Sequence, residues 1–201
     1  ATLPDFLILS AATKNSSQVL GAPATPATWQ TAQACLYSAS PAPAATVVAA
    51  GAGASLALAC DFIVAAENAS FIEVFVNVGL VPDSGSSYFL PKAISPARAF
   101  EMATMAPKIS AAQAMEWGLV NRVVAADGLD EEVAKVADYY AQAPTMAIGM
   151  IKKMLNKAGH SDLQTMLQYE AYCQEIAGRS EDYREGVTAF NEKRKPNFKG
   201  K

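Results

Sequence analysis

Residues 46–60 read TVVAAGAGASLALAC: a short β-branched run, then two glycines among small residues, then an apolar segment. Valine and threonine favour strands, whereas Gly51 and Gly53 permit a tight turn. The apolar residues 56–60 predict a helix after that turn. The segment therefore predicts a strand, a turn at Gly51-Ala52-Gly53 and a helix, in that order.

A turn of this kind is suited to holding a negatively charged oxygen. Where a strand enters a helix, the first backbone N–H groups of the helix are unpaired and lie at the positive end of its dipole. Small side chains at 51–54 let a ligand carbonyl approach, and each well-placed donor stabilises an enolate by roughly 3 kcal/mol. The same sequence pattern also occurs where a helix packs closely on a strand and in nucleotide-binding sites. The turn alone therefore leaves these alternatives open.

Beyond the turn the chain changes from strands to helices. Phe62–Ala66 and Ser70–Val78 predict two strands, and Pro82–Gly85 predicts a turn before a helix that begins at Ser86. Helical periodicity then predicts helices at Ala97–Met105, Ala111–Trp117, Leu129–Ala141, Met146–Asn156, Leu163–Ile176 and Glu181–Lys193. Charged residues return with these helices, so we expect an α/β core over residues 1–125 and a helical region over residues 126–201.

Composition limits the class of partner. The 201 residues carry a net charge of −3, so no overall field recruits nucleic acid. Cys35, Cys60 and Cys173 are odd in number and lack C-x-x-C spacing, which argues against disulfides, a metal site and an oxidising compartment, and favours the cytoplasm. The apolar run 44–60 lacks the anchors of a membrane span, and no secretory signal is recognisable. A small molecule is the expected partner.

The first part of the chain has an unusual composition. Residues 1–60 contain only two charged residues, Asp5 and Lys14, and residues 21–50 are rich in Ala, Pro and Thr without helical or strand periodicity. One interpretation is a flexible loop followed by a plain helix. The hypothesis that we favour is that residues 1–50 are an incomplete record of the natural sequence, with alanine in place of other side chains. The intact mass of the purified protein distinguishes the two.

Four blocks of sequence resemble the crotonase family of enoyl-CoA hydratases and isomerases. They are residues 49–61 (AAGAGASLALACD), residues 69–91 with VGLVPDSGSS at 78–87, residues 109–120 (ISAAQAMEWGLV) and residues 184–198 (REGVTAFNEKRKPNF). The blocks follow the family's order and spacing from about Thr46 to Phe198, which makes the resemblance specific.

The resemblance implies an α/β fold, a crotonase-like spiral of ββα units, with a C-terminal helical region that builds homotrimers or dimers of trimers. It implies a coenzyme-A thioester as substrate, with no separate cofactor and no metal. By position, the backbone N–H of Ala52, between Gly51 and Gly53, is one donor of the oxyanion hole. The other donor comes from an earlier loop, where Ser17 is the candidate although the family's glycine is absent.

The acid–base residues of the family's hydratases are missing. These enzymes divide their proton transfers between two glutamates, and Ser55 and Phe75 align with them here, where both are expected to line a dry pocket. Glu73 is expected on the same strand face as Phe75, so a shift of register would restore one glutamate. Asp83 lies before a helix, where some isomerases resembling this chain carry a single acid–base carboxylate; capping that helix is its alternative role.

One carboxylate is enough to move a double bond. The predicted function is therefore isomerisation of a 3-enoyl-CoA, or of a related ring, through Asp83. A hydratase, a nucleophilic Asp83 acting in hydrolysis or dehalogenation, and a non-catalytic CoA-binding subunit are the alternatives. The resemblance further implies that Phe190 and Lys193 reach the adenine–phosphate end of CoA, on the same or a neighbouring subunit.

Overall fold

The computed structural model describes residues 8–11 and 47–201. Ser17 and most of the compositionally unusual segment 1–50 lie outside these residues, so the expectations for them stay predictions. The described residues form two compact units, which divide between Lys135 and Val136, inside helix α5 (Leu129–Ala141). Each unit is described by itself below, and the domain boundary expected near residue 125 also stays a prediction.

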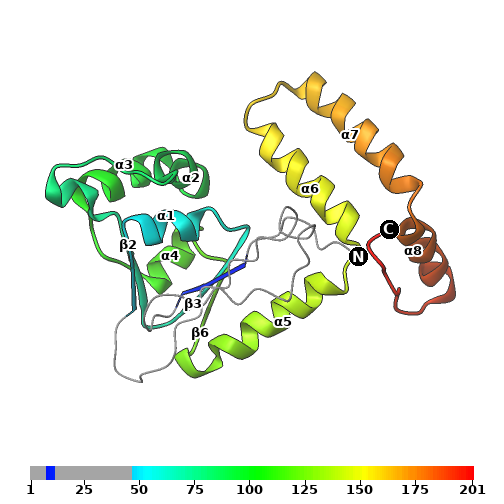
Figure 1. Cartoon of the computed structure of the whole chain (residues 1–201), viewed down its shortest axis with the longest axis horizontal. Coiled ribbons are helices and arrows are strands. Elements are labelled where there is room, and N and C mark those ends of the chain that lie inside the picture. The colour runs from blue at the N-terminus through cyan, green and yellow to red at the C-terminus, as the bar shows by residue number, and fades with distance from the viewer. Residues whose placement is uncertain (1–7, 12–46) are drawn as a thin grey trace, which may run out of the picture. The chain divides into compact units, whose positions relative to one another are not determined.

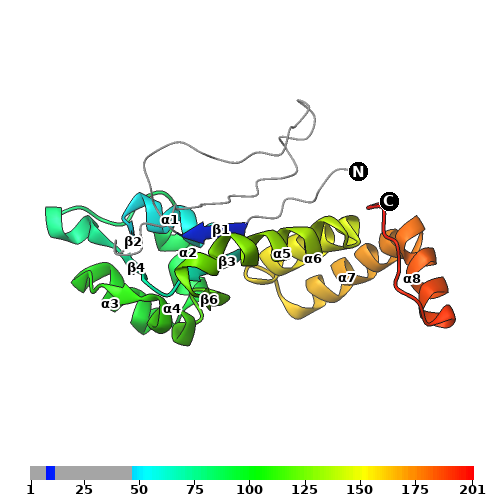
Figure 2. The ribbon, with the colours of Figure 1, turned by 90° about the horizontal axis from the view of Figure 1, so that it is seen from below.

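The first unit contains two three-stranded sheets with helices between their strands (Figure 1). In one sheet β3 (Phe62–Ala66) is central and pairs in parallel with β1 (Ile8–Ala11) and β6 (Arg122–Val124). In the other sheet β4 (Ala69–Ile72) is central and pairs in parallel with β2 (Val47–Ala50) and antiparallel with β5 (Ile109–Ser110). Figure 2 shows β1 in blue beside β3.

The helices of this unit connect the strands and cover them. They are α1 (Ala52–Leu58), the 3₁₀ helix η1 (Val74–Val78), α2 (Ser86–Ala93), α3 (Pro96–Met105), α4 (Ala111–Trp117) and the short η2 (Ala126–Gly128), followed by α5. Parallel strands need such helical connections, because a tight hairpin cannot join two parallel strands. The predicted elements therefore alternate along the chain as an α/β fold demands.

Helix α1, which follows the Gly51 turn, packs into the hydrophobic core of the first unit. Leu58 of α1 packs in one cluster with Phe71 of β4 and Met102 of α3, all of them buried. A second cluster joins α5 to β3 through Leu129 and Val64. Burying a side chain of this size stabilises the fold by about 1.5–3 kcal/mol, so α1 is fixed from its inner face.

The predicted strand Ser70–Val78 is wrong beyond Ile72, where the chain enters η1. The β-branched residues 74–78 favour a strand locally, but the neighbouring strand β2 ends at Ala50, opposite Ile72. Without a partner strand the segment closes its own hydrogen bonds as a 3₁₀ helix, which ends at Gly79 with φ 74°. The expected alternation of side chains from Glu73 to Phe75 is therefore wrong as well.

The helix after the Gly51 turn is longer than predicted. It begins at Ala52, directly after the glycine, instead of at residue 56. Small residues are compatible with a helix, and Ala54 and Ala57 are buried on its inner face. The glycine-rich segment therefore includes the first turn of α1, and the unpaired backbone N–H groups of the helix lie in this turn.

The second unit is helical, with α6 (Thr145–Ala158), α7 (Leu163–Gly178) and α8 (Glu181–Glu192). Both views show α6 and α7 side by side (Figure 1 and Figure 2). The side chains of Asp162 and Ser180 cap α7 and α8 by accepting from the N–H groups of Thr165 and Tyr183. No helix within the described residues is both long enough and apolar enough to cross a bilayer.

The last residues fold back onto α8. Asp182 is buried and its two carboxylate oxygens accept from the backbone N–H groups of Lys199 and Gly200, at 2.6 Å and 2.8 Å. Glu185 binds both terminal nitrogens of the Arg194 guanidinium, at 2.7 Å and 3.0 Å, and also accepts from the backbone N–H of Asn197. Two carboxylates on one helix thereby anchor the C-terminal segment, residues 193–201.

Candidate active site

The turn predicted to hold an oxyanion connects β2 to α1 at Gly51. Gly51 has φ 52° and ψ −124°, a conformation open to glycine and strained for other residues. Its N–H donates to the carbonyl of Ile72 at 3.0 Å, and its carbonyl accepts the first helical bond from the N–H of Ser55 at 3.0 Å. Ala52 and Gly53 follow in the exposed first turn of α1, whose N–H groups have no acceptor within the helix. These groups are available as donors to a bound oxyanion.

Ser55 and Phe75 lie against this turn. Ser55 is fully buried, and its hydroxyl donates to the Gly51 carbonyl at 3.2 Å. Phe75 is also buried, and its Cζ is 3.5 Å from the position that a Cβ on Gly51 would take. Neither side chain carries a carboxyl group, in contrast to the glutamates expected at these two positions in the hydratases of the family. Gly51, Ala52, Gly53, Ser55 and Phe75 thus come together as one local structure.

Asp83 occupies the turn before α2. Its side chain is exposed, and one carboxylate oxygen accepts from the Ser84 hydroxyl at 2.9 Å. Its backbone carbonyl accepts from the N–H of Ser86 at 2.9 Å. The N-cap of α2 is Gly85, with φ 87° and no side-chain cap, so the alternative role of Asp83 as the cap of this helix is wrong. The carboxylate is accessible to a ligand.

Glu73, between β4 and η1, is a second carboxyl group in this region. Its side chain is 0 % exposed, and Oε1 accepts from the Ser86 hydroxyl at 2.7 Å. Oε2 is buried and has no hydrogen-bond partner in the described part of the chain. Burial raises the pKa of Glu73 above its usual value; the Ser86 hydrogen bond opposes this, and the charge of Asp83 adds to it.

Phe190 and Lys193, the candidates for binding the end of CoA, belong to the second unit. Phe190 is 83 % exposed near the end of α8. Lys193 is the C-cap of that helix, in the left-handed conformation with φ 54°. Both residues therefore lie where α8 meets the C-terminal segment. Over residues 8–11 and 47–201, no three His, Cys, Asp or Glu side chains are grouped as a metal site.

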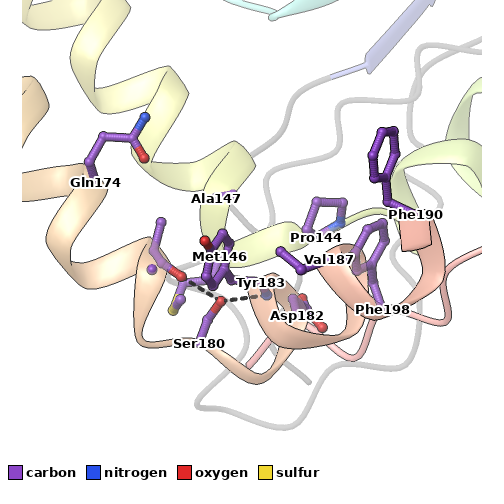
Figure 3. A pocket seen from close by; sticks show the side chains of 13 residues that line it. Pro144, Met146, Ala147, Gln174, Ser180, Asp182, Tyr183, Val187, Phe190 and Phe198 are labelled. Atoms are coloured by element: carbon purple, nitrogen blue, oxygen red, sulfur yellow. Dashed lines mark hydrogen bonds between the residues drawn. The ribbon is translucent and has the colours of Figure 1, made fainter. Parts of the chain in front are cut away.

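Phe190 also lines a cavity of about 380 Å³ within the second unit. Apolar side chains from three helices and the C-terminal segment surround it, among them Met146, Val187 and Phe198 (Figure 3). The dashed lines in Figure 3 mark the two hydrogen bonds of Ser180, which accepts from the N–H of Tyr183 and donates to the carbonyl of Ala177. An apolar ligand or an apolar side chain would fit this space.

Comparison with known proteins decides the family. The profile of the enoyl-CoA hydratase/isomerase family matches residues 28–201, which is most of the chain. The chain belongs to the enoyl-CoA hydratase/isomerase family.

Enoyl-CoA hydratase/isomerase relatives cover three quarters of this chain. It is 44% identical over 147 residues to 1,2-epoxyphenylacetyl-CoA isomerase of Escherichia coli (strain K12), covering 73% of this chain and 56% of the relative. It is 38% identical over 152 residues to carnitinyl-CoA dehydratase of Salmonella typhi, covering 73% and 58%. The crystal structure of an enoyl-CoA hydratase from Bacillus anthracis superposes with a TM-score of 0.74 at 35% identity, covering 78% of this chain and 61% of that one.

These comparisons confirm the predicted fold class, a crotonase-like α/β fold with a C-terminal helical region. They also show that the chain spans a little over half the length of these curated relatives. The names of the relatives include both isomerase and dehydratase.

Sequence reasoning missed one member of the site and misjudged another. Ser86 was expected only as the start of a helix, yet its hydroxyl binds Glu73. Glu73 was considered only as a misaligned catalyst, and it is enclosed instead. A signal was present in the sequence: a glutamate among apolar residues, thirteen positions before a serine at a helix start, needs a buried partner.

Proposed function

We propose that this protein is an acyl-CoA isomerase, which moves a double bond from the 3-position to the 2-position of an enoyl thioester or carries out a related ring isomerisation. Asp83 is the acid–base residue. The backbone N–H of Ala52 is one donor to the thioester oxygen, and Ser17 is the candidate for the other. No additional cofactor takes part, because coenzyme A is carried by the substrate.

The reaction needs one carboxylate and conserves all atoms. The carboxylate of Asp83 takes a proton from C2 of the 3-enoyl thioester, and the electron pair of that C–H bond passes into the thioester carbonyl as a dienolate. Backbone N–H groups stabilise the negative oxygen. The carboxyl group then returns the proton to C4, the double bond forms between C2 and C3, and the carboxylate is regenerated.

The observation that carries the proposal is the contrast between the two carboxyl groups near the turn. Asp83 is exposed and Glu73 is enclosed, so only Asp83 is open to a substrate. The positions aligned with the hydratase glutamates hold a hydroxyl bound to Gly51 and a phenyl ring. Such a site lacks the pair of groups that would activate water on one side and protonate carbon on the other.

The substrate's other end and the assembly are parts of the same proposal. Phe190 and Lys193 supply an exposed aromatic ring and an ammonium group, which suit the adenine and phosphates of CoA. The exposed apolar side chains of α6 and α7 support assembly into homotrimers or dimers of trimers. Within the described residues neither Cys60 nor Cys173 forms a disulfide, which supports a reducing compartment such as the cytoplasm.

Asp83→Asn tests the proposed catalyst. The amide keeps the size of the side chain but cannot accept the proton, so we expect double-bond migration in a 3-enoyl-CoA to fall by about 10³-fold or more. Binding of the CoA ester should change by less than about twofold, since Asp83 holds no part of CoA in this scheme. Migration is followed by the absorbance of the conjugated product and binding by calorimetry.

Asp130→Asn is the matched control, because Asp130 is an exposed aspartate in the first turn of α5. It should retain full activity. Full activity of Asp83→Asn would refute the proposal. Conversion of crotonyl-CoA to a 3-hydroxy product at a comparable rate would indicate a hydratase, thioester cleavage a hydrolase, and binding without any turnover a non-catalytic CoA-binding subunit.

A further inference from the structure

We infer that Glu73 is a positioning residue: through its hydrogen bond with Ser86 it holds the Asp83 turn in a fixed place relative to the Gly51 turn. The inference rests on the function proposed above, in which these two turns supply the carboxylate and a backbone donor. Glu73 itself is 0 % exposed and is therefore not a group that touches substrate.

One side of Glu73 is fixed to the Gly51 turn by its chain neighbours. The carbonyl of Ile72 accepts the N–H of Gly51 at 3.0 Å. On the other side, the Cγ2 atom of Val74 is 3.3 Å from the place of a Cβ on Gly51, so Val74 lies against the same glycine. The backbone at Glu73 therefore cannot move without moving the donor turn.

The side chain of Glu73 reaches the second turn. Its Oε1 accepts from the hydroxyl of Ser86 at 2.7 Å, and Ser86 is the fully buried first residue of α2. The backbone N–H of Ser86 donates to the carbonyl of Asp83 at 2.9 Å. This short chain of contacts joins the proposed acid–base residue to the donor turn, although Asp83 precedes α2 by three positions in an exposed turn.

The environment of Glu73 argues against a role in folding alone. Burying a carboxyl group with one unpartnered oxygen lowers stability, and an apolar residue of similar size would avoid that loss. Glutamine keeps an oxygen that can accept from the Ser86 hydroxyl, and its amide is neutral, which suits a site whose burial raises the pKa of Glu73. Glutamine is therefore the conservative replacement for the proposed role.

The test compares Glu73→Ala, Ser86→Ala and Glu73→Gln in the full chain, with Val133→Ala as the control. Each alanine variant removes the hydrogen bond, and misplacing a catalytic group should lower kcat by about tenfold with KM changed less than about twofold. The double alanine variant should be no slower than the slower single variant, since both remove one contact. Glu73→Gln should stay within about threefold of wild type.

Val133 is buried between α5 and β3, so Val133→Ala loses packing without touching either turn and should leave kcat unchanged. Exchange of the Ser86 amide proton, followed by NMR, gives a readout without turnover: it should speed up by about tenfold in the alanine variants and not in the control. Ser86→Ala removes only one oxygen atom and is therefore the milder change. It still tests the inference if Glu73→Ala does not fold.

Several outcomes would overturn the inference. The first is full kcat in Ser86→Ala with unchanged exchange of the backbone amide at position 86. The second is a loss that appears in KM alone. The third is a Glu73→Gln variant as slow as Glu73→Ala, which would show that an oxygen accepting from Ser86 is not what matters. Failure of the proposed function would give a different result. The wild type would then not move the double bond, or would move it no faster than Asp83→Asn does. The amide exchange then still decides whether Glu73 holds the turn.

Discussion

At the scale of single residues, Gly51 and Gly53 show how neighbouring glycines serve different purposes. Gly51 has a positive φ and faces the side chains of Val74 and Phe75, whereas Gly53 lies in α1 with open space where a Cβ would be. The first glycine is required by the turn, whereas neither the backbone conformation nor the packing requires the second.

Gly51→Ala should therefore destabilise the protein by about 1–3 kcal/mol, because alanine strains the backbone here and crowds Val74. Gly53→Ala is the matched control and should stabilise by up to about 1 kcal/mol, as alanine does within a helix. Urea unfolding followed by circular dichroism measures both free energies of unfolding. Equal stability of the two variants would show that the Gly51 conformation is not strained for alanine.

At the scale of elements, sequence patterns located the helices better than the strands. Leu129–Ala141 agrees with α5 at both ends, and Ser110 and Ser180 begin helices as caps, since these signals are local. Residues 73–78 favour a strand by composition, but the neighbouring strand β2 pairs only as far as Ile72 and turns away at Gly51, so they have no partner strand there.

The same limit applies to the candidate site. Ala52, Ser55 and Phe75 could be placed around the turn because the motif fixes their spacing. The sequence signals that Glu73 needs a buried partner, but it does not show that the partner is Ser86, because that depends on the packing of α1 against α2. Local pattern gives the residues of a site, whereas contacts between elements require the three-dimensional structure.

The link between α8 and the C-terminal segment should break in acid. Arg194 and the Asn197 N–H hold the pKa of Glu185 at about 2, below its usual value of 4.5. The carboxylate therefore stabilises the segment fully above the unfolded-state pKa, and this contribution is lost as pH falls through about 2. In wild type, protection of the Asn197 amide from exchange should decline over that range.

Glu185→Ala should remove the protection at neutral pH. Glu192→Ala is its control, because Glu192 binds Nε of the same Arg194 at 2.6 Å without contacting the backbone of the segment. Protection that persists in Glu185→Ala at pH 7 would show that Asp182 alone holds the segment.

At the scale of the whole molecule, the second unit leaves much apolar surface uncovered. Ile151, Leu155 and Leu167 of α6 and α7 are 47%, 71% and 50% exposed and line one groove. A patch of this kind on a helical pair is typical of a surface that another subunit covers. The proposed trimer or dimer of trimers would bury it.

Leu167→Glu should convert the assembly to monomers, because a carboxylate in an apolar interface loses its hydration without a partner. Gln168→Glu places the same charge on the adjacent, exposed position of α7 and should leave the assembly intact. Sedimentation velocity gives the mass of each species. A wild type that sediments as a monomer would contradict the proposed assembly.

The hydrogen bond from Gly51 to Ile72 belongs both to the sheet and to the proposed oxyanion turn. It is the final rung between β2 and β4, and within the described residues β2 is an outer strand of its sheet. Outer strands fray before a domain melts. The edge of the sheet and the proposed oxyanion turn thus share one piece of backbone. If the turn acts as proposed, mild heating that loosens this edge should lower activity before the rest of the fold unfolds.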